Sequence, residues 1–203
     1  EWARIEPVIE GLLSAQPEIL LSVDTFHAGV ARWALDAGAV LINDITAGRD
    51  PDMWPMLAER QTPYVMMHMQ GTLQTMQENP EYGDQGGVLS AIKSYFSERL
   101  SSLEAVGLNA DYICFDPGIG FGKSYEHNLD LLRGLAEMQT SRPVLLGVSR
   151  KTVIGQLIGE SEPTRRDRAT AIITALACKS GIKLHRVHDV EGAVEAIRIA
   201  QSL

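Results

Sequence analysis

Short apolar segments alternate with longer amphipathic ones along the whole chain, and this alternation limits the possible folds more than any other feature. The apolar segments are almost continuous, as buried parallel strands are, and cover residues 19–24, 40–44, 64–69, 112–116, 144–148 and 183–187. The segments between them have helical periodicity and cover residues 28–37, 52–60, 88–106, 125–136, 152–158, 169–179 and 190–200. The pattern predicts six βα units, either in an open doubly wound sheet or as part of an eight-unit barrel.

Composition narrows the class of protein. The 203 residues are 45% hydrophobic, and no linker interrupts the pattern, so we expect one domain over residues 1–203. The formal net charge of -8 argues against a surface for nucleic acid or for an anionic membrane. No apolar run approaches the roughly 20 residues that a membrane span needs. The only two cysteines, Cys114 and Cys178, are not spaced as a metal or redox motif, which favours a reducing compartment such as the cytoplasm.

Polar side chains follow nearly every predicted strand. Because the carboxyl ends of parallel strands meet at one edge, where ligands bind in both candidate folds, we expect these residues to converge. Singly, an Asp in this place more often caps the next helix. The strand-end residues are Asp24, Thr25, Asn43, Asp44, His68, Asp116, Ser149, Arg150, Lys151, Arg186 and His188.

A glycine-rich turn follows the fourth strand, between Asp116 and Ser124. It is not a P-loop, because Pro117 stands where that motif requires glycine. The glycines would let the backbone approach a flat ligand while Asp116 accepts hydrogen bonds from an aminopyrimidine edge. The alternative is a tight βα turn in which Asp116 caps the next helix.

Basic residues follow the last two strands. A period of two places Arg186 and His188 on one face, where they suit phosphate oxygens, unless Arg186 is a structural partner of Asp189. Ser149 and Lys151 precede a short helix and could attract a carboxylate, or could form a solvated basic turn. The scattered histidines predict no catalytic zinc site.

Several motifs, in their order along the chain, resemble the dihydropteroate synthase family. The resemblance runs essentially from end to end, and the fourth and last of the motifs are the most specific. The motifs are Ser-Val-Asp-Thr25, Ile-Asn-Asp44, Met-His-Met-Gln-Gly71, Asp-Pro-Gly-Ile-Gly-Phe-Gly-Lys123, Gly-Val-Ser-Arg-Lys151 and Arg-Val-His-Asp189.

The resemblance implies a (β/α)8 TIM barrel of which this chain holds the third to eighth units. Residues 1–13 lack an initial Met and read as a helix, so we expect the first two strands to be absent. The family also implies Mg2+ as cofactor, but the associated Asn lies in that N-terminal part, so no metal ligand is assigned here. Leu73, where the family often has proline, should only loosen its loop.

The resemblance also implies roles for individual residues. The pterin ring would be held by Asp24, Asn43, Asp116 and Lys151. Arg186 and His188 would bind the pyrophosphate, and Ser149 would lie near the carboxylate of p-aminobenzoate. Met67 and Phe121 would be apolar walls, unless they simply belong to the core.

The implied reaction joins 6-hydroxymethyl-7,8-dihydropterin pyrophosphate to p-aminobenzoate and releases pyrophosphate, as a step of folate biosynthesis. Asp24, Lys151, Arg186 and His188 would act electrostatically, without a covalent intermediate. Sulfonamides would compete with p-aminobenzoate, and a homodimer is usual in the family. Two alternatives remain open, a pterin-binding barrel of a corrinoid-dependent methyltransferase and an inactive barrel that only binds or scaffolds. The basic residues favour the synthase over the methyltransferase.

Overall fold

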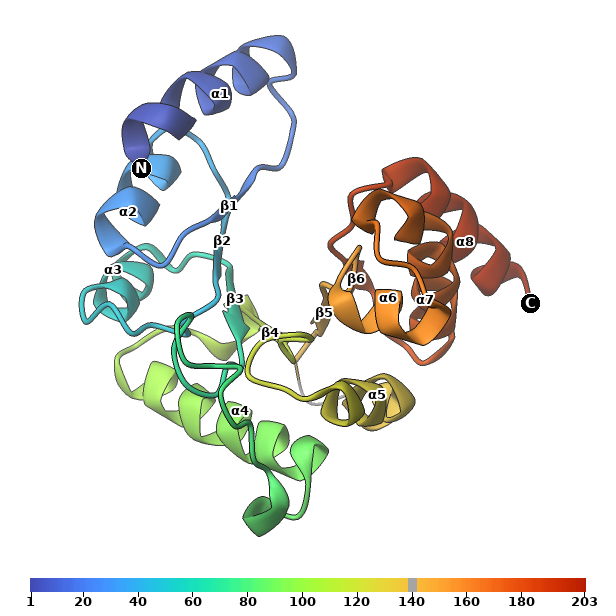
Figure 1. Ribbon diagram of the computed structural model, residues 1–203. Coiled ribbons are helices and arrows are strands. Elements are labelled where there is room, and N and C mark those ends of the chain that lie inside the picture. Colours follow the sequence, from blue (N-terminus) through green and yellow to red (C-terminus); the bar gives the residue numbers. More distant parts are fainter. Residues whose placement is uncertain (139–141) are drawn as a thin grey trace. The chain divides into compact units, whose positions relative to one another are not determined.

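A computed structural model describes residues 1–138 and 142–203, in which helices and strands alternate (Figure 1). The strands are β1 (Ser22–Asp24), β2 (Leu41–Asp44), β3 (Tyr64–Met67), β4 (Ile113–Asp116), β5 (Leu145–Leu146) and β6 (Leu184–His185). The α-helices are α1 (Trp2–Ala15), α2 (Ala28–Asp36), α3 (Met53–Arg60), α4 (Val88–Ala105), α5 (Tyr125–Arg133), α6 (Thr152–Ile158), α7 (Asp167–Lys179) and α8 (Val190–Ser202). Short 3-10 helices are η1 (Gly83–Gln85), η2 (Ala110–Tyr112), η3 (Leu135–Met138) and η4 (Pro163–Arg166).

The chain divides into two compact units. Unit 1 comprises Glu1–His68 and Phe96–Phe115, and unit 2 comprises Met69–Tyr95 and Asp116–Leu203. The sheet order is β1-β2-β3-β4, and β1 with β2, and β2 with β3, pair in parallel. In unit 2, β5 pairs in parallel with β6. The prediction of one domain over residues 1–203 stays a prediction.

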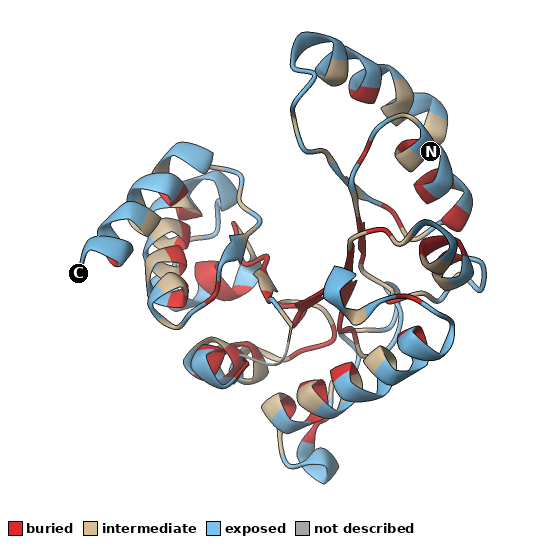
Figure 2. Cartoon of the chain, turned by 180° about the vertical axis from the view of Figure 1, so that it is seen from behind, coloured by how far each residue is buried: buried red, intermediate tan, exposed pale blue. Residues whose placement is uncertain are grey.

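Buried apolar side chains fill each unit, and the strands and inner helix faces carry them while outer faces are exposed (Figure 2). In unit 1, Phe96 of α4 stacks on Phe115 of β4 with ring centroids 4.2 Å apart. Trp2 of α1 meets Trp33 of α2 at 5.9 Å. In unit 2, helices α7 and α8 have the most extensive contact of any helix pair described. Among the described residues no helix is long and apolar enough to cross a membrane.

The boundaries refine the sequence predictions. Every predicted strand is present but shorter, and the last two are reduced to two residues each. The ladder nevertheless continues past β6, because the Arg186 amide donates to the Leu146 carbonyl at 3.1 Å. The helix predicted over 125–136 ends at Arg133, since the following Gly134 packs against Leu89 and η3 begins there. Gly107, which follows the end of α4, has a φ of +93°.

Candidate active site

In unit 1, the strand ends of β1 and β2 bring an acid and an amide together. Asp24 and Asn43 are register partners on these parallel strands. The Asn43 side-chain Nδ2 donates to the Asp24 carboxylate at 2.8 Å. Asp24 is exposed whereas Asn43 is only 6% exposed, so the amide is held rigidly beneath the carboxylate.

The Asn43 amide leaves one buried acceptor. With Nδ2 committed to Asp24, the Asn43 Oδ1 is buried and has no hydrogen-bond partner among the described residues. An unmet buried acceptor costs about 1–3 kcal/mol, so such groups usually mark a place where a ligand or water donates. Asp24 and Asn43 together therefore present acceptors suited to N–H donors of a heterocycle.

Asp44, the next residue of β2, has a different role. Its Oδ1 accepts from the Thr46 amide and hydroxyl, both at 2.7 Å. Its Oδ2 accepts from the Gly48 amide and the Tyr64 hydroxyl, both at 2.8 Å. Four donors and complete burial make Asp44 a structural carboxylate that fixes the turn after β2.

In unit 2, Asp116 is a buried carboxylate surrounded by cations. It is 5% exposed and accepts a hydrogen bond of 2.7 Å from the Gly118 amide. Burial raises its pKa above the ordinary value, while Lys151, the Gly118 hydrogen bond, Lys123 and Arg186 act to lower the pKa. Since the cap of α5 is Ser124, the interpretation of Asp116 as a helix cap is wrong.

Lys151 lies beside Asp116 and Phe121. Its ammonium group donates to the Ile119 carbonyl at 2.5 Å and stands 4.7 Å from the centre of the Phe121 ring. A Cβ on Gly147 would lie 3.6 Å from the Asp116 carboxylate and 4.0 Å from the Lys151 Nζ. Burial lowers the pKa of Lys151, Asp116 opposes that effect and Arg186 adds to it. The alternative of a solvated basic turn is therefore wrong for Lys151.

The glycine-rich turn directs its carbonyl groups toward side-chain donors. The Ile119 carbonyl accepts from Lys151 Nζ at 2.5 Å, and the Gly120 carbonyl accepts from Gln77 Nε2 at 2.8 Å. The Phe121 carbonyl accepts from Lys123 Nζ at 2.9 Å, and the Gly122 carbonyl accepts from the Tyr82 hydroxyl at 2.6 Å. Asn128 of α5 adds a hydrogen bond to the Gly120 amide at 2.7 Å. The turn is thus fixed by side chains of unit 2 before any ligand binds.

Gly122 is the turn position where no other residue fits. Its φ is +61°, which disfavours any side chain. A Cβ at Gly122 would lie 2.5 Å from the backbone oxygen of Gln70, which cannot move as a flexible side chain would. The glycine therefore allows the turn to lie against residues 69–71.

Ser149 and His188 form a hydrogen-bonded pair in unit 2. The Ser149 hydroxyl lies 2.8 Å from His188 Nδ1 and accepts from the His188 amide at 3.2 Å. A hydroxyl can donate to Nδ1 or accept from it, so this contact fits either tautomer of the neutral ring. In the tautomer in which Ser149 donates, His188 carries its ring proton on Nε2.

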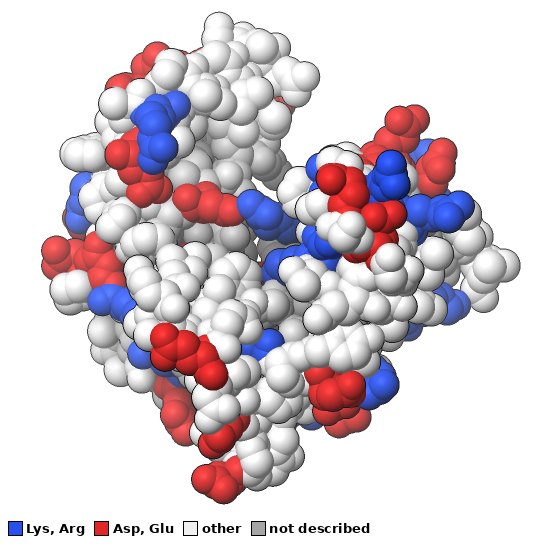
Figure 3. All heavy atoms as spheres, in the orientation of Figure 1, with Lys and Arg blue, Asp and Glu red and all other residues white. Residues whose placement is uncertain are grey.

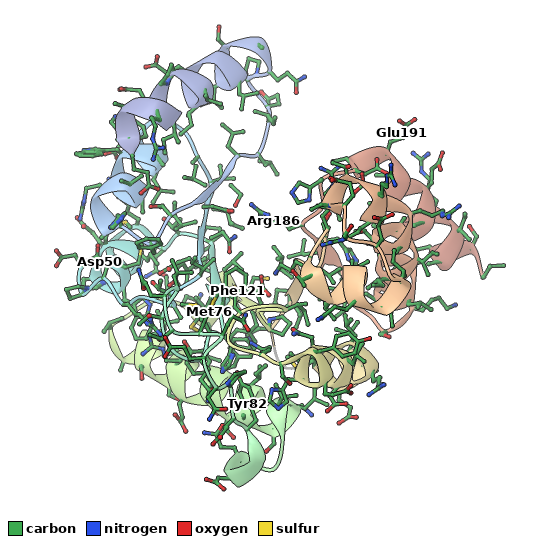
Figure 4. All side chains as sticks on the ribbon, viewed as in Figure 1. Asp50, Met76, Tyr82, Phe121, Arg186 and Glu191 are labelled. Atoms are coloured by element: carbon green, nitrogen blue, oxygen red, sulfur yellow. The ribbon has the colours of Figure 1, made fainter. Side chains whose placement is uncertain are left out.

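Arg186 adds a positive charge to the same group. It is exposed, and its charge acts on both Asp116 and Lys151. Figure 4 shows the Arg186 side chain extending away from helices α6–α8. Asp189 caps α8 by accepting from the Gly192 amide at 3.2 Å. Arg186 is thus placed beside the buried acid and amine rather than on the helical surface of unit 2.

No cluster of three or more His, Cys, Asp or Glu that could hold a metal occurs in residues 1–138 and 142–203. Over the face in Figure 3, acidic and basic side chains are interspersed, without the extended basic field that nucleic acid requires.

Comparison with known proteins decides the family. Residues 1–188 match the family described as "Pterin binding enzyme". The dihydropteroate synthase of Escherichia coli strain K12 is 40% identical over 205 residues, which cover all of this chain and 70% of that protein. The chain belongs to the dihydropteroate synthase family. It is accordingly a transferase of folate biosynthesis.

Solved dihydropteroate synthases have the same fold. The Yersinia pestis enzyme in a sulfonamide drug complex matches with a TM-score of 0.93 and 36% identity, over 99% of this chain and 72% of that one. The Xanthomonas albilineans enzyme in complex with 7,8-dihydropteroate matches with a TM-score of 0.90 and 37% identity, over 100% and 73%. These matches confirm the predicted α/β barrel class and favour dihydropteroate synthase over the methyltransferase alternative.

The predicted site residues separate into two groups. Asp116, Phe121, Ser149, Lys151, Arg186 and His188 all lie in unit 2. There the charge of Lys151 acts on Asp116, the Lys151 ammonium stands over the Phe121 ring, and the Ser149 hydroxyl is hydrogen-bonded to His188. Asp24 and Asn43 meet in unit 1, whereas Met67 is a buried residue of the same sheet. The roles assigned to these residues in dihydropteroate synthase remain proposals.

Sequence reasoning missed Lys123 as a member of this group. Lys123 is 2% exposed, and burial, helped by Lys151 and opposed by Asp116, lowers its pKa to about 7. It also missed Gln77 and Asn128, which hold the turn. The Gly-Lys dipeptide at 122–123 pointed to Lys123, but nothing in the sequence alone shows that its side chain is buried.

Proposed function

We propose a division of labour among these residues in dihydropteroate synthesis, in which 6-hydroxymethyl-7,8-dihydropterin pyrophosphate and p-aminobenzoate give 7,8-dihydropteroate and pyrophosphate. The observation that carries it is a buried carboxylate, Asp116, whose charge is balanced by Lys151, Lys123 and Arg186. An acid that is buried and yet surrounded by cations suits a ligand that brings both N–H donors and negative phosphate groups.

The pterin ring would be bound by acceptors. Asp116 would take two N–H bonds from the aminopyrimidine edge, and Lys151 would donate to a ring acceptor. Phe121, whose ring lies beside the Lys151 ammonium, supplies a flat apolar wall. In unit 1, Asp24 and Asn43 are proposed as pterin ligands from the family resemblance, supported by the unmet Asn43 Oδ1. Met67 is proposed as a second apolar wall.

The pyrophosphate would be bound by donors. The guanidinium of Arg186 would offer a bidentate fork, and His188 would offer Nε2–H in the tautomer in which Ser149 donates to its Nδ1. As the bond between the exocyclic methylene and the pyrophosphate oxygen breaks, negative charge grows on the leaving oxygen. Arg186 and His188 would stabilise that charge, which is electrostatic catalysis.

The nucleophile is the arylamine nitrogen of p-aminobenzoate. Its lone pair forms the new C–N bond while the C–O bond breaks, and the nitrogen then loses one proton to solvent. Asp24 would stabilise positive charge that spreads from the methylene into the pterin. Ser149 and Lys151 are proposed near the p-aminobenzoate carboxylate. No general base is assigned, because an arylamine is only weakly basic.

The described residues form no group of side chains that could bind Mg2+ by themselves. Mg2+ commonly binds through one or two carboxylates together with substrate phosphates. The described residues offer no cluster of carboxylates for it. Mg2+ is therefore proposed only as a companion of the pyrophosphate, and no step of the reaction is assigned to it.

The setting of the enzyme is also a proposal. A reducing compartment such as the cytoplasm is proposed, because Cys114 and Cys178 are the only two cysteines of the sequence and are not spaced as a metal or redox motif. A homodimer is proposed from the family alone.

Pyrophosphate release with both substrates present tests the reaction. We expect pyrophosphate release that depends on p-aminobenzoate. A protein that releases no pyrophosphate with both substrates present would be the binding or scaffolding barrel instead. A sulfonamide titrated in the presence of pyrophosphate and a pterin tests the site proposed for p-aminobenzoate. We expect competition with p-aminobenzoate, and failure to compete would remove the prediction that sulfonamides bind at the same place.

A further inference from the structure

Arg150, between Ser149 and Lys151, has an unusual backbone conformation. Its φ is +59°, in the left-handed region that residues with a Cβ rarely occupy. Such conformations persist only where the surroundings enforce them, and they concentrate at functional sites. The contacts of Arg150 identify what enforces this one.

The Arg150 side chain is held by the first residue of α7. Its Nε and Nη2 both donate to the Asp167 carboxylate at 2.7 Å, which is a bidentate ion pair. The Arg150 guanidinium holds the pKa of Asp167 below its ordinary value. This geometry fixes the direction of the Arg150 side chain in a way that a single contact could not.

The Arg150 backbone is held by the same part of the chain. Its carbonyl accepts from Arg166 Nη1 at 2.9 Å, and its amide donates to the Thr170 hydroxyl at 3.4 Å. Arg166 is 7% exposed and also donates to the carbonyls of Glu160 and Ser161 at 3.0 and 2.5 Å. A rigid, buried guanidinium therefore holds the Arg150 carbonyl in place.

The neighbours of Arg150 are residues to which roles were given above. Ser149, before it, lies with its hydroxyl 2.8 Å from His188 Nδ1, and Lys151, after it, donates to the Ile119 carbonyl at 2.5 Å. Because the φ of residue 150 sets how the two flanking residues are turned relative to one another, a negative φ there would change the direction of one side chain relative to the other.

We propose that Arg166 and Asp167 are positioning residues, which clamp Arg150 in its left-handed conformation and so aim Ser149 and Lys151 at p-aminobenzoate. The inference rests on the proposed function for the identity of the ligand. The clamp itself rests only on contacts within unit 2. Arg166 and Asp167 need not touch substrate, and their effect passes through Arg150.

Hydrogen exchange tests the clamp without any catalysis. In Asp167→Asn and Arg150→Lys, we expect amides of residues 148–155 to exchange several-fold faster than in the unchanged protein. The matched control is Asp130→Asn, which breaks the exposed Arg133–Asp130 pair at 3.0 Å on α5 and should leave residues 148–155 unchanged. Unchanged exchange in both clamp variants would overturn the proposal.

Steady-state kinetics tests the consequence for the substrate. We expect Asp167→Asn to raise the KM for p-aminobenzoate, and the Ki of a sulfonamide, about tenfold, since small misplacements far from the chemistry have large effects. A merely structural loss would lower the active fraction, and hence kcat, and leave KM in place. Faster exchange with an unaltered KM and Ki would also overturn the positioning role.

Two substitutions at Arg150 separate the backbone from the side chain. Arg150→Gly and Arg150→Ala both remove the ion pair, but only glycine accepts positive φ without strain. We expect the KM for p-aminobenzoate to rise less in Arg150→Gly than in Arg150→Ala, and the reverse order would contradict the clamp. If the unchanged enzyme releases no pyrophosphate, the proposed function fails, while hydrogen exchange still decides the clamp.

Discussion

The Asn43 side-chain amide donates to the Asp24 carboxylate at 2.8 Å across two neighbouring parallel strands, and the Asn43 Oδ1 is buried with no partner among the described residues. The pair shows how a sheet can present acceptors that are ordered before a ligand arrives. Because an asparagine at position 24 could keep this hydrogen bond, a substitution there can remove the charge and keep the contact.

Asp24→Asn should lower turnover about a hundredfold, because it removes one preorganised charge worth roughly 3 kcal/mol in the transition state. The asparagine oxygen can still accept from Asn43, so the fold should be kept. The measurement is kcat for pyrophosphate release together with the midpoint of urea unfolding. Asp36→Asn, at the exposed Arg60–Asp36 pair, is the control and should leave kcat unchanged. Near-normal turnover of Asp24→Asn would remove its catalytic role.

The burial of Lys123 should make the free energy of unfolding rise with pH. Burial lowers its pKa to about 7, against 10.5 for an ordinary lysine. Between these values the unfolded chain binds the proton that the folded protein has released, so the free energy of unfolding increases with pH in this window. Lys123→Met should reduce that increase, and Lys183→Met, at an exposed position, should not. Urea unfolding at pH 7 to 10 measures both, and equal slopes would contradict the burial of this charge.

Gly122→Ala should destabilise the protein by about 2 kcal/mol or more, because it combines left-handed strain with a collision. The collision is with the Gln70 carbonyl, 2.5 Å from the new Cβ. Gly159→Ala is the matched control, since its φ of +71° is similar and nothing lies within 4 Å of a Cβ there. Chemical denaturation of the two variants should show the larger loss at 122, and equal losses would mean that the turn can shift.

Asp44→Asn should cost about 2–3 kcal/mol of unfolding free energy. The side chain loses its negative charge, and its new NH2 group faces hydrogen-bond donors where only an acceptor fits. Tyr64→Phe removes only one of the four donors to Asp44 and should cost about 1 kcal/mol. The KM values of the folded fraction should stay normal in both. An altered KM for the pterin pyrophosphate would place Asp44 in the binding site instead.

Much of the fold follows from the sequence for a physical reason. Buried parallel strands are almost continuously apolar, so residues 64–67 and 113–115 stand out, and Gly107 marks the end of α4. Strand lengths could not be predicted in the same way, because backbone pairing sets them: Val148 is as apolar as Leu146 and lies outside β5.

The site was predictable where a residue type is unusual for its position. Asp116 and Arg186 are polar groups at the ends of apolar segments, which the sequence shows directly. The sequence does not show which partner a polar group takes. Asp189 caps α8, while Asp167, which reads as an ordinary helix start, holds Arg150.

The full set of donors around Asp44 affects how mutational surveys of this family should be read. Asn43 and Asp44 are consecutive, yet the Asn43 Oδ1 has no hydrogen-bond partner among the described residues, whereas both carboxylate oxygens of Asp44 accept hydrogen bonds within unit 1. A growth screen would record both positions as intolerant and would invite a single explanation. Only separate measurement of how much protein accumulates and how fast each molecule turns over would distinguish a lost catalyst from a lost scaffold.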